Sequence, residues 1–110
     1  MQVPDTLIDE AARRFALLSD PTRLRILSVL LERGSLTVTE LAGALGMAPP
    51  NVSQHLARLR SGGMVTRRRD GRSLHYSVTD PSLQSLCELM CTSLQERTER
   101  LLAARARAVG

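Results

Sequence analysis

The sequence predicts a mainly α-helical fold with one small β-hairpin. Apolar residues recur at helical spacing through most of the chain, and capping residues, glycines and prolines divide that pattern into separate helices. Between Met64 and Val78 the period changes to two around an Asp-Gly pair. At 110 residues we expect a single domain, residues 1–110, with an aliphatic core because Trp is absent and Phe and Tyr occur once each.

Two amphipathic helices are expected first. Residues 5–18 place apolar side chains on one stripe, namely Ile8, Ala11, Ala12, Phe15 and Leu18. Asp20-Pro21 then supplies an N-cap and a first-turn proline for a second helix that stops near Gly34. Its predicted apolar stripe is Leu24, Leu27, Leu30 and Leu31.

The next two helices are short and close together. Thr37 and Glu40 have the spacing of a capping box, and Gly46 is a left-handed stop. Pro49-Pro50 fits only the first turn of the following helix, which Gly62-Gly63 ends. Its apolar side carries Val52, Leu56 and Leu59. The turn between the two helices is about three or four residues long, which is the length of a helix-turn-helix, and the second would be its recognition helix.

A β-hairpin, or wing, follows this pair. Asp70-Gly71 predicts a type I′ turn with those two residues as the loop. In that register the facing pairs are Arg69 with Arg72, Arg67 with Leu74, Thr66 with His75, and Val65 with Tyr76. We expect Val65, Leu74 and Tyr76 on the core side, and Arg68, Ser73 and His75 on the other. Two arginines at an exposed tip favour a phosphate backbone lying there.

A long last helix is predicted after Asp80-Pro81, over residues 81–105. Its apolar stripe comprises Leu83, Leu86, Cys87, Met90, Cys91 and Leu94. This is more apolar surface than one small domain should leave exposed. We therefore expect the first helix (5–18) and the last helix to form a dimer interface.

The charge is concentrated in one part of the chain. Residues 51–76 carry six Arg and one Asp (+5), and the remainder carries nine Arg and ten acids (−1). A local excess of this kind indicates a surface that binds a polyanion. No signal peptide or membrane-length apolar stretch is seen, and two cysteines fit a reducing cytoplasm without a membrane role. The sequence has no phosphate loop, Ser-His-Asp set or carboxylate pair, so an enzyme is not expected.

Three segments resemble one family. Residues 17–28 (LLSDPTRLRILS), 41–65 and 67–78 (RRRDGRSLHYSV) look like the ArsR-type (ArsR/SmtB) winged helix-turn-helix regulators. The resemblance implies five helices plus a wing, a homodimer, and a repressor of transcription bound to a pseudo-palindromic operator in double-stranded DNA. It also implies release from DNA when an effector binds.

The resemblance also places the DNA contacts. The family's base-proximal positions fall on Pro49, Pro50, Ser53 and Gln54, and its wing contacts fall on residues 68–72. Polar residues are usual where the prolines stand, so direct readout is expected from Ser53 and Gln54, with Pro50 meeting a thymine methyl. Backbone contacts are expected from Asn51 and Arg58. The wing residues expected at DNA are Arg68, Arg69, Arg72 and His75.

The effector site is less defined. The third-helix cysteines of one family metal site are absent, because residues 40–43 are Glu, Leu, Ala and Gly. The other family site is shared between the last helices of two partners. It falls on Asp80 and Ser82 of one chain and on Ser93 and Glu96 of the other, without its histidines. Two carboxylates are a poor site for Zn, Ni or Co, and Asp80 is explained as an N-cap.

The two cysteines leave three alternatives open. Cys87 and Cys91 lie one helical turn apart on the expected interface. They could bind a thiophilic metal or metalloid, form an intersubunit disulfide, or serve as small buried apolar residues. The expected effector is thus a transition metal ion (Ni, Zn or Co) or a thiophilic metalloid. The alternative is a DNA-binding subunit controlled by a partner protein or a non-metal signal.

Overall fold

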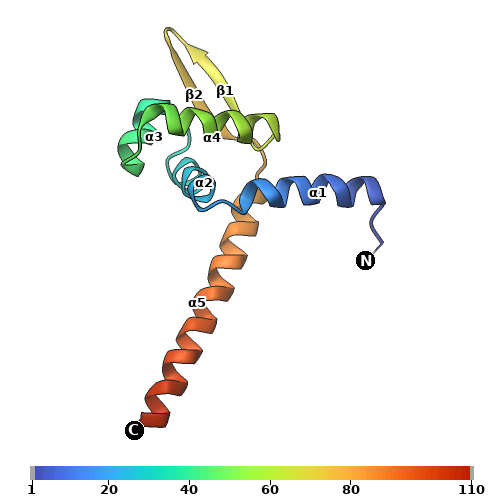
Figure 1. Ribbon diagram of the computed structural model, residues 1–110, viewed down its shortest axis with the longest axis vertical. Helices are drawn as coiled ribbons and strands as arrows, with labels where there is room; N and C mark the ends of the chain where they lie inside the picture. Colours follow the sequence, from blue (N-terminus) through green and yellow to red (C-terminus); the bar gives the residue numbers. More distant parts are fainter. Residues whose placement is uncertain (1, 110) are drawn as a thin grey trace. The chain divides into compact units, whose positions relative to one another are not determined.

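The computed structural model describes residues 2–109 and shows helices, one hairpin and a long final helix (Figure 1). The elements, in order, are α1 (Asp5–Leu18), α2 (Pro21–Arg33), α3 (Val38–Leu45), α4 (Pro49–Ser61), β1 (Val65–Asp70), β2 (Ser73–Val78) and α5 (Ser82–Val109). The chain divides into two compact units, one ending at Asp80 and the other beginning at Pro81. The predicted fold class, mainly α with a small hairpin, is confirmed.

The caps that punctuate the sequence form as expected. The Asp20 side chain accepts a hydrogen bond from the Arg23 backbone N–H at 2.9 Å, which caps α2. Thr37 and Glu40 form both bonds of a capping box at the start of α3. Gly46 ends α3 at φ 64°, a left-handed conformation that glycine adopts without strain. The chain therefore leaves α3 abruptly and enters α4 after three residues.

The core of the first unit lies between α2, α3, α4 and the base of the hairpin. Its buried members are Ile26, Leu27, Leu30, Leu36, Leu41, Ala42, Val52, Leu56, Leu59, Met64, Val65 and Tyr76. The stripe predicted for α2 is partly wrong, because Leu24 is 41% exposed whereas Ile26 is fully buried. Three elements besides α1 pack on α2. The buried side of the helix is therefore wider than the predicted stripe and is centred on different residues.

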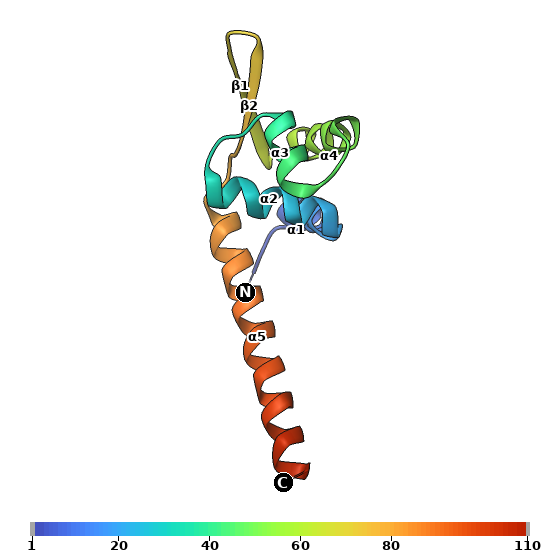
Figure 2. The ribbon, with the colours of Figure 1, turned by 90° about the vertical axis from the view of Figure 1, so that its left-hand side faces the viewer.

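The hairpin is tied to the helices at its base. Leu36 and Tyr76 exchange backbone hydrogen bonds of 3.0 and 2.8 Å, so the residue before α3 pairs with β2. Figure 2 shows the hairpin projecting from this base beyond α3 and α4. The wing is thus anchored at one end and free at the other.

The predicted register of the wing is wrong. The observed pairs are Asp70 with Ser73, Arg69 with Leu74, Arg68 with His75, Arg67 with Tyr76, and Val65 with Val78. The loop is therefore Gly71-Arg72, not Asp70-Gly71. Gly71 has φ 62° and no other residue of the turn has positive φ, which excludes type I′ and matches the type II′ pattern with glycine first. Because the slip moves each partner by two residues, the predicted faces are unchanged.

The second unit is the helix α5. It begins at Ser82, after Pro81, and extends to Val109, which is beyond the predicted end at residue 105. Leu83 is its one buried residue among those described. No helix within residues 2–109 is long and apolar enough to cross a bilayer.

Candidate nucleic-acid interface

The recognition helix α4 is fixed from one side and open on the other. Val52, Leu56 and Leu59 have no exposed surface, so they hold the helix against the core. The residues between them point outward and are exposed, namely Asn51, Ser53, Gln54, Ala57, Arg58 and Arg60. Within residues 2–109, the side chains of Asn51, Ser53 and Gln54 make no hydrogen bond, so their donors and acceptors are available to a ligand.

The first turn of α4 offers few backbone donors. Pro49 and Pro50 occupy its first two positions and carry no N–H, and Ala48 provides no side-chain cap. The Asn51 N–H donates to the Ala48 carbonyl at 3.0 Å. Phosphate binds at a helix start through free backbone amides. Since two of those amides are missing here, this helix start is a weak phosphate site and has an apolar surface. Pro50 is exposed, which leaves its ring open to an apolar partner.

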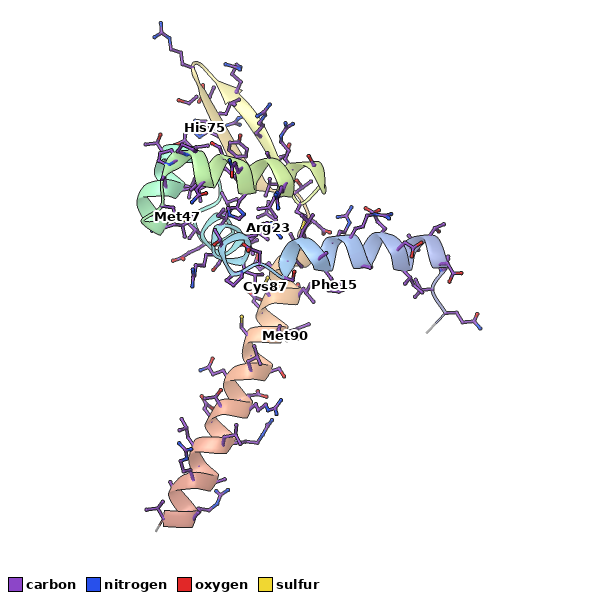
Figure 3. The ribbon with its side chains drawn as sticks, in the orientation of Figure 1. Phe15, Arg23, Met47, His75, Cys87 and Met90 are labelled. Atoms are coloured by element: carbon purple, nitrogen blue, oxygen red, sulfur yellow. The ribbon has the colours of Figure 1, made fainter. Side chains whose placement is uncertain are left out.

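The preceding turn sets the angle between α3 and α4. It consists of Gly46, Met47 and Ala48, and the Met47 N–H donates to the Ala42 carbonyl at 3.0 Å. Met47 is half-buried where the turn leaves α3 (Figure 3). The two helices pack directly on one another. The predicted helix-turn-helix, with its short turn, is confirmed.

The wing carries arginine on both faces. Arg67 and Arg69 lie on the face that buries Val65 and Tyr76, Arg68 lies on the opposite face with His75, and Arg72 is in the turn. All four are exposed. Arg67 donates to the Tyr76 hydroxyl at 3.4 Å. No carboxylate of residues 2–109 forms an ion pair with Arg68, Arg69 or Arg72, so their charge is free to meet an anion.

His75 is less exposed than the wing arginines. It is half-buried on β2 and its charge acts on Glu40 of α3. The pKa of Glu40 lies below its ordinary value of 4.5, first because the Thr37 backbone N–H donates to it and to a smaller extent because of His75. Figure 3 labels His75 part of the way along the hairpin, where its pair with Arg68 is the third from the turn. Its predicted DNA contact stays a prediction, at a position between the tip and the base of the wing.

His55, in the middle of α4, lies toward the core. Its Nδ1 atom is 3.9 Å from the Asp20 carboxylate and is buried without a hydrogen-bond partner among the residues described. Asp20 has a lowered pKa, chiefly because the Arg23 backbone N–H donates to it. His55 therefore links α4 to the start of α2, in keeping with a structural role.

The candidate effector residues are spread along the chain. Cys87 is half-buried and Cys91 is exposed, and both are free thiols one turn apart on α5. Burial, and to a lesser extent the neighbouring Cys91, raises the pKa of Cys87. The candidate carboxylates are Asp80, which precedes α5, and Glu96, which lies 14 residues beyond the first residue of α5, or about 21 Å along the helix. Across residues 2–109, no three His, Cys, Asp or Glu side chains form a group able to hold a metal ion.

Two further exposed arginines lie beside residues that are predicted to contact DNA. Arg60 lies in the last turn of α4, and Arg67 lies in β1. Both were within the segment of excess positive charge, but neither matched a family contact position. The charge count was the signal that would have included them.

Comparison with known proteins is consistent with this geometry. The family model described as "Bacterial regulatory protein, arsR family" matches residues 20–67. The "Probable mercury resistance operon repressor" of Streptomyces lividans is 46% identical over 88 residues, covering 80% of this chain and 70% of that protein. An arsenic resistance transcriptional regulator of Pseudomonas putida is 40% identical, covering 79% of this chain and 76% of that protein.

Solved structures share the fold. The AntR antimony-specific transcriptional repressor superposes with a TM-score of 0.80 at 33% identity, covering 90% of this chain and 89% of that one. A homodimeric winged helix-turn-helix DNA-binding domain from Mycobacterium bovis gives a TM-score of 0.79 at 32% identity, covering 87% of this chain and 88% of that one.

Proposed function

The chain belongs to the arsR family of bacterial regulatory proteins and is a DNA-binding transcriptional regulator, not an enzyme, and from this premise we propose that it is a homodimeric, metal- or metalloid-responsive repressor. In this proposal two copies of α4 enter successive major grooves of a pseudo-palindromic operator, about 34–36 Å apart. The two wings lie along the backbone on either side. A repressor of this kind acts in the cytoplasm, where the chromosome is.

The observation that carries the DNA-binding surface is its combination of free polar groups and unpaired charge. Ser53 and Gln54 are exposed on a rigidly packed helix, and both can hydrogen-bond to base edges. Asn51 and Arg58 flank them and are assigned to the backbone. The wing supplies Arg68, Arg69 and Arg72 without competing carboxylates. Pro50 is assigned to a thymine methyl, and His75 to the backbone beside the middle of the wing.

The dimer is supported by apolar surface that a single chain leaves exposed. In α1 the exposed side chains are Leu7, Ile8 and Phe15, between 51% and 58% exposed. In α5 they are Leu89, Met90, Leu94, Leu101, Leu102 and Val109, between 55% and 86% exposed. Exposed apolar residues in such number on two helices are typical of an interface. The homodimeric relative from Mycobacterium bovis supports a second copy of this chain as the partner.

The effector proposal rests on the chemistry of the two thiols. Two thiols favour a soft ion, whereas carboxylates without histidine are a poor site for Ni, Zn or Co. The relatives' names refer to mercury, arsenic and antimony. Cys87 and Cys91 are one turn apart, with Cys91 open to solvent. Two sulfurs do not complete a metal site, and residues 2–109 hold no group of three candidate ligands, so a complete site would draw further ligands from the second copy. A bound ion would lock the α5 helices in one arrangement and so shift the spacing of the recognition helices.

One titration tests both parts of the proposal. The reduced protein is added to its promoter DNA at fixed salt, alone and with Hg(II), arsenite, antimonite, Zn, Ni or Co. Tight binding that soft ions weaken supports the repressor and its thiol effector site. Tight binding that no ion changes would leave the DNA-binding function and would favour control by a partner protein or a non-metal signal.

A further inference from the structure

The end of α1 lies directly against the end of α4. Gly62 caps the C-terminus of α4, with its N–H donating to the Arg58 carbonyl at 3.0 Å. A Cβ atom at Gly62 would overlap the Cδ1 methyl of Leu17 in α1. The φ of Gly62 is −82°, which any residue can adopt, so a larger residue here would be opposed by the Leu17 side chain and not by backbone conformation.

The neighbouring residue continues the contact toward the wing. Gly63 has φ 75°, and Met64 then begins the path into β1, with its N–H donating to the Leu59 carbonyl at 2.9 Å. The Arg14 guanidinium of α1 lies 3.6 Å from the position of a Gly63 Cβ. Arg14 and Leu17 are three residues apart on one face of α1. This face therefore covers the corner where the recognition helix passes into the wing.

The same end of α1 is held to α2. Arg23 is half-buried at the junction of α1 and α2 (Figure 3), and its Nε donates to the Leu17 carbonyl at 2.7 Å. Arg23 also donates its backbone N–H to Asp20, whose carboxylate is 3.9 Å from His55 of α4. Leu17 is thus fixed through its backbone to α2 while its side chain lies on Gly62. Its position is determined from two directions, which is what a joint between α1 and α4 requires.

We propose that the contact between Leu17 and Gly62 positions the recognition helix and wing relative to α1, and thereby sets the distance between the two recognition helices of the dimer. This inference rests on the proposed function, because it takes α1 to be part of the dimer interface. The remainder of α1 supports that premise, since its apolar side chains Leu7, Ile8 and Phe15 are exposed.

Simple geometry shows why a small joint matters. α1 has 14 residues, so it is about 21 Å long. A rotation of about 10° at its end moves the other end by about 3.7 Å, close to the 3.4 Å rise of one nucleotide along a strand. If the contact at Gly62 were loose, the distance between the two recognition helices would therefore vary by about the length of one base pair, while α1 and α4 stayed folded.

The test compares three variants with a matched control. Gly62→Ala forces Leu17 either to swing its side chain out or to move with α1, and either response breaks the contact. Leu17→Ala removes the same contact from the other side, and the third variant combines both changes. The control is Gly43→Ala, also a glycine-to-alanine change in a helical region, where a Cβ would meet nothing within 4 Å.

Each protein is measured on operators with the preferred half-site spacing, with one base pair added or removed, and on a single half-site. We expect Gly62→Ala and Leu17→Ala each to reduce the preference for the native spacing by roughly 3- to 10-fold, and the double variant to lose no more than either alone. Single half-site affinity and the dimer population by sedimentation should match those of Gly43→Ala.

Three results would overturn the inference. The first is a spacing preference in both single variants equal to that of Gly43→Ala. The second is a loss of affinity that is the same for every operator and follows thermal stability, because a merely structural role would produce it. The third is a wild-type protein that is monomeric or indifferent to spacing, which would refute the proposed dimeric function as well.

Discussion

Removing the charge at the tip of the wing should flatten the salt dependence of DNA binding. The change is Arg69→Ala with Arg72→Ala. It removes one arginine near the end of β1, where Arg69 pairs with Leu74, and one arginine from the turn. Both side chains are exposed and neither has an ion-pair partner among the residues described. The substitutions therefore take away charge without leaving a buried carboxylate uncompensated, and folding should be nearly unaffected.

The magnitude follows from counterion release. Each phosphate contact contributes about 0.9 to the slope of log K against log salt, so loss of four arginines from a dimer lowers the slope by about 3.6. Between 50 and 200 mM salt the wild type would then lose roughly 150-fold more affinity than the variant. Fluorescence anisotropy with a labelled operator duplex measures both slopes.

A control separates contact from net charge. Arg105→Ala with Arg107→Ala removes the same charge from the end of α5. This variant should keep the wild-type slope, because its arginines lie outside the proposed interface. Equal slopes for the wild type and the wing variant, or equal losses in the wing and α5 variants, would refute the assignment of the wing to the DNA backbone.

The remaining predictions concern the recognition helix, the effector and the third helix. Replacing thymine with uracil in the operator should weaken wild-type binding about fourfold at each methyl that meets Pro50, and Pro50→Ser should be insensitive to the replacement; a wild type indifferent to uracil everywhere would contradict this contact. Cys87→Ser with Cys91→Ser should abolish the response to Hg(II) or arsenite while DNA affinity and dimerisation are retained, whereas Asp80→Asn with Glu96→Gln should respond normally. Burial raises the pKa of Cys87, so ion binding must displace a proton there and should weaken by up to about tenfold for each unit by which the pH is lowered. Thr37→Ala should cost about 1 kcal/mol in urea unfolding through loss of the cap. Because the pKa of Glu40 is lowered below 4.5 in the folded chain, its charge stabilises the fold above that pH and ceases to do so as the pH falls through the lowered value; Glu40→Gln should therefore melt below the wild type near neutral pH and together with it in strong acid.

The helix boundaries could be predicted because local chemistry determines them. The Asp20 cap, the Thr37–Glu40 box and the Gly46 stop act within four residues of sequence, and each forms as expected. The buried side of α2 could not be predicted as well. Which residues of α2 are buried depends on the three other elements that pack around it. For this reason Ile26 is buried and Leu24, which was predicted to be buried, is exposed.

The wing shows the same division between local and tertiary information. Alternation of apolar and polar residues determines which side of each strand faces the core, so Val65 and Tyr76 were placed correctly. The two loop residues depend on which residue takes positive φ. The sequence indicates that this residue is Gly71, but it does not indicate whether Gly71 is the first or the second residue of the loop. The consequence for function is that Arg69 faces Leu74 and not Arg72, so the tip is not a pair of opposed like charges.

The contact between Leu17 and Gly62 had no signal in the sequence. The sequence identifies Gly62 only as a helix stop. A glycine that lies against a distant side chain cannot be distinguished in a sequence from one that is favoured by its own backbone conformation. Leu17 lies on no predicted stripe of α1. Such a contact is specified jointly by residues 45 positions apart, and only the folded chain brings them together.

α5 is the element that we expect a partner to stabilise most. It is 28 residues long, yet Leu83 is its one buried side chain among those described, so little tertiary packing within the chain stabilises it. If α5 is ordered by dimerisation, then ions bound at Cys87 and Cys91 act on the same equilibrium that positions the recognition helices. Linkage makes this coupling reciprocal: an ion that weakens operator binding by some factor must itself bind more weakly to the operator complex by that factor. Calorimetric titration of Hg(II) into the free dimer and into the complex measures that ratio. A ratio of one, together with an ion-dependent loss of DNA affinity, would mean that the ion acts by precipitating or unfolding the protein and not through α5.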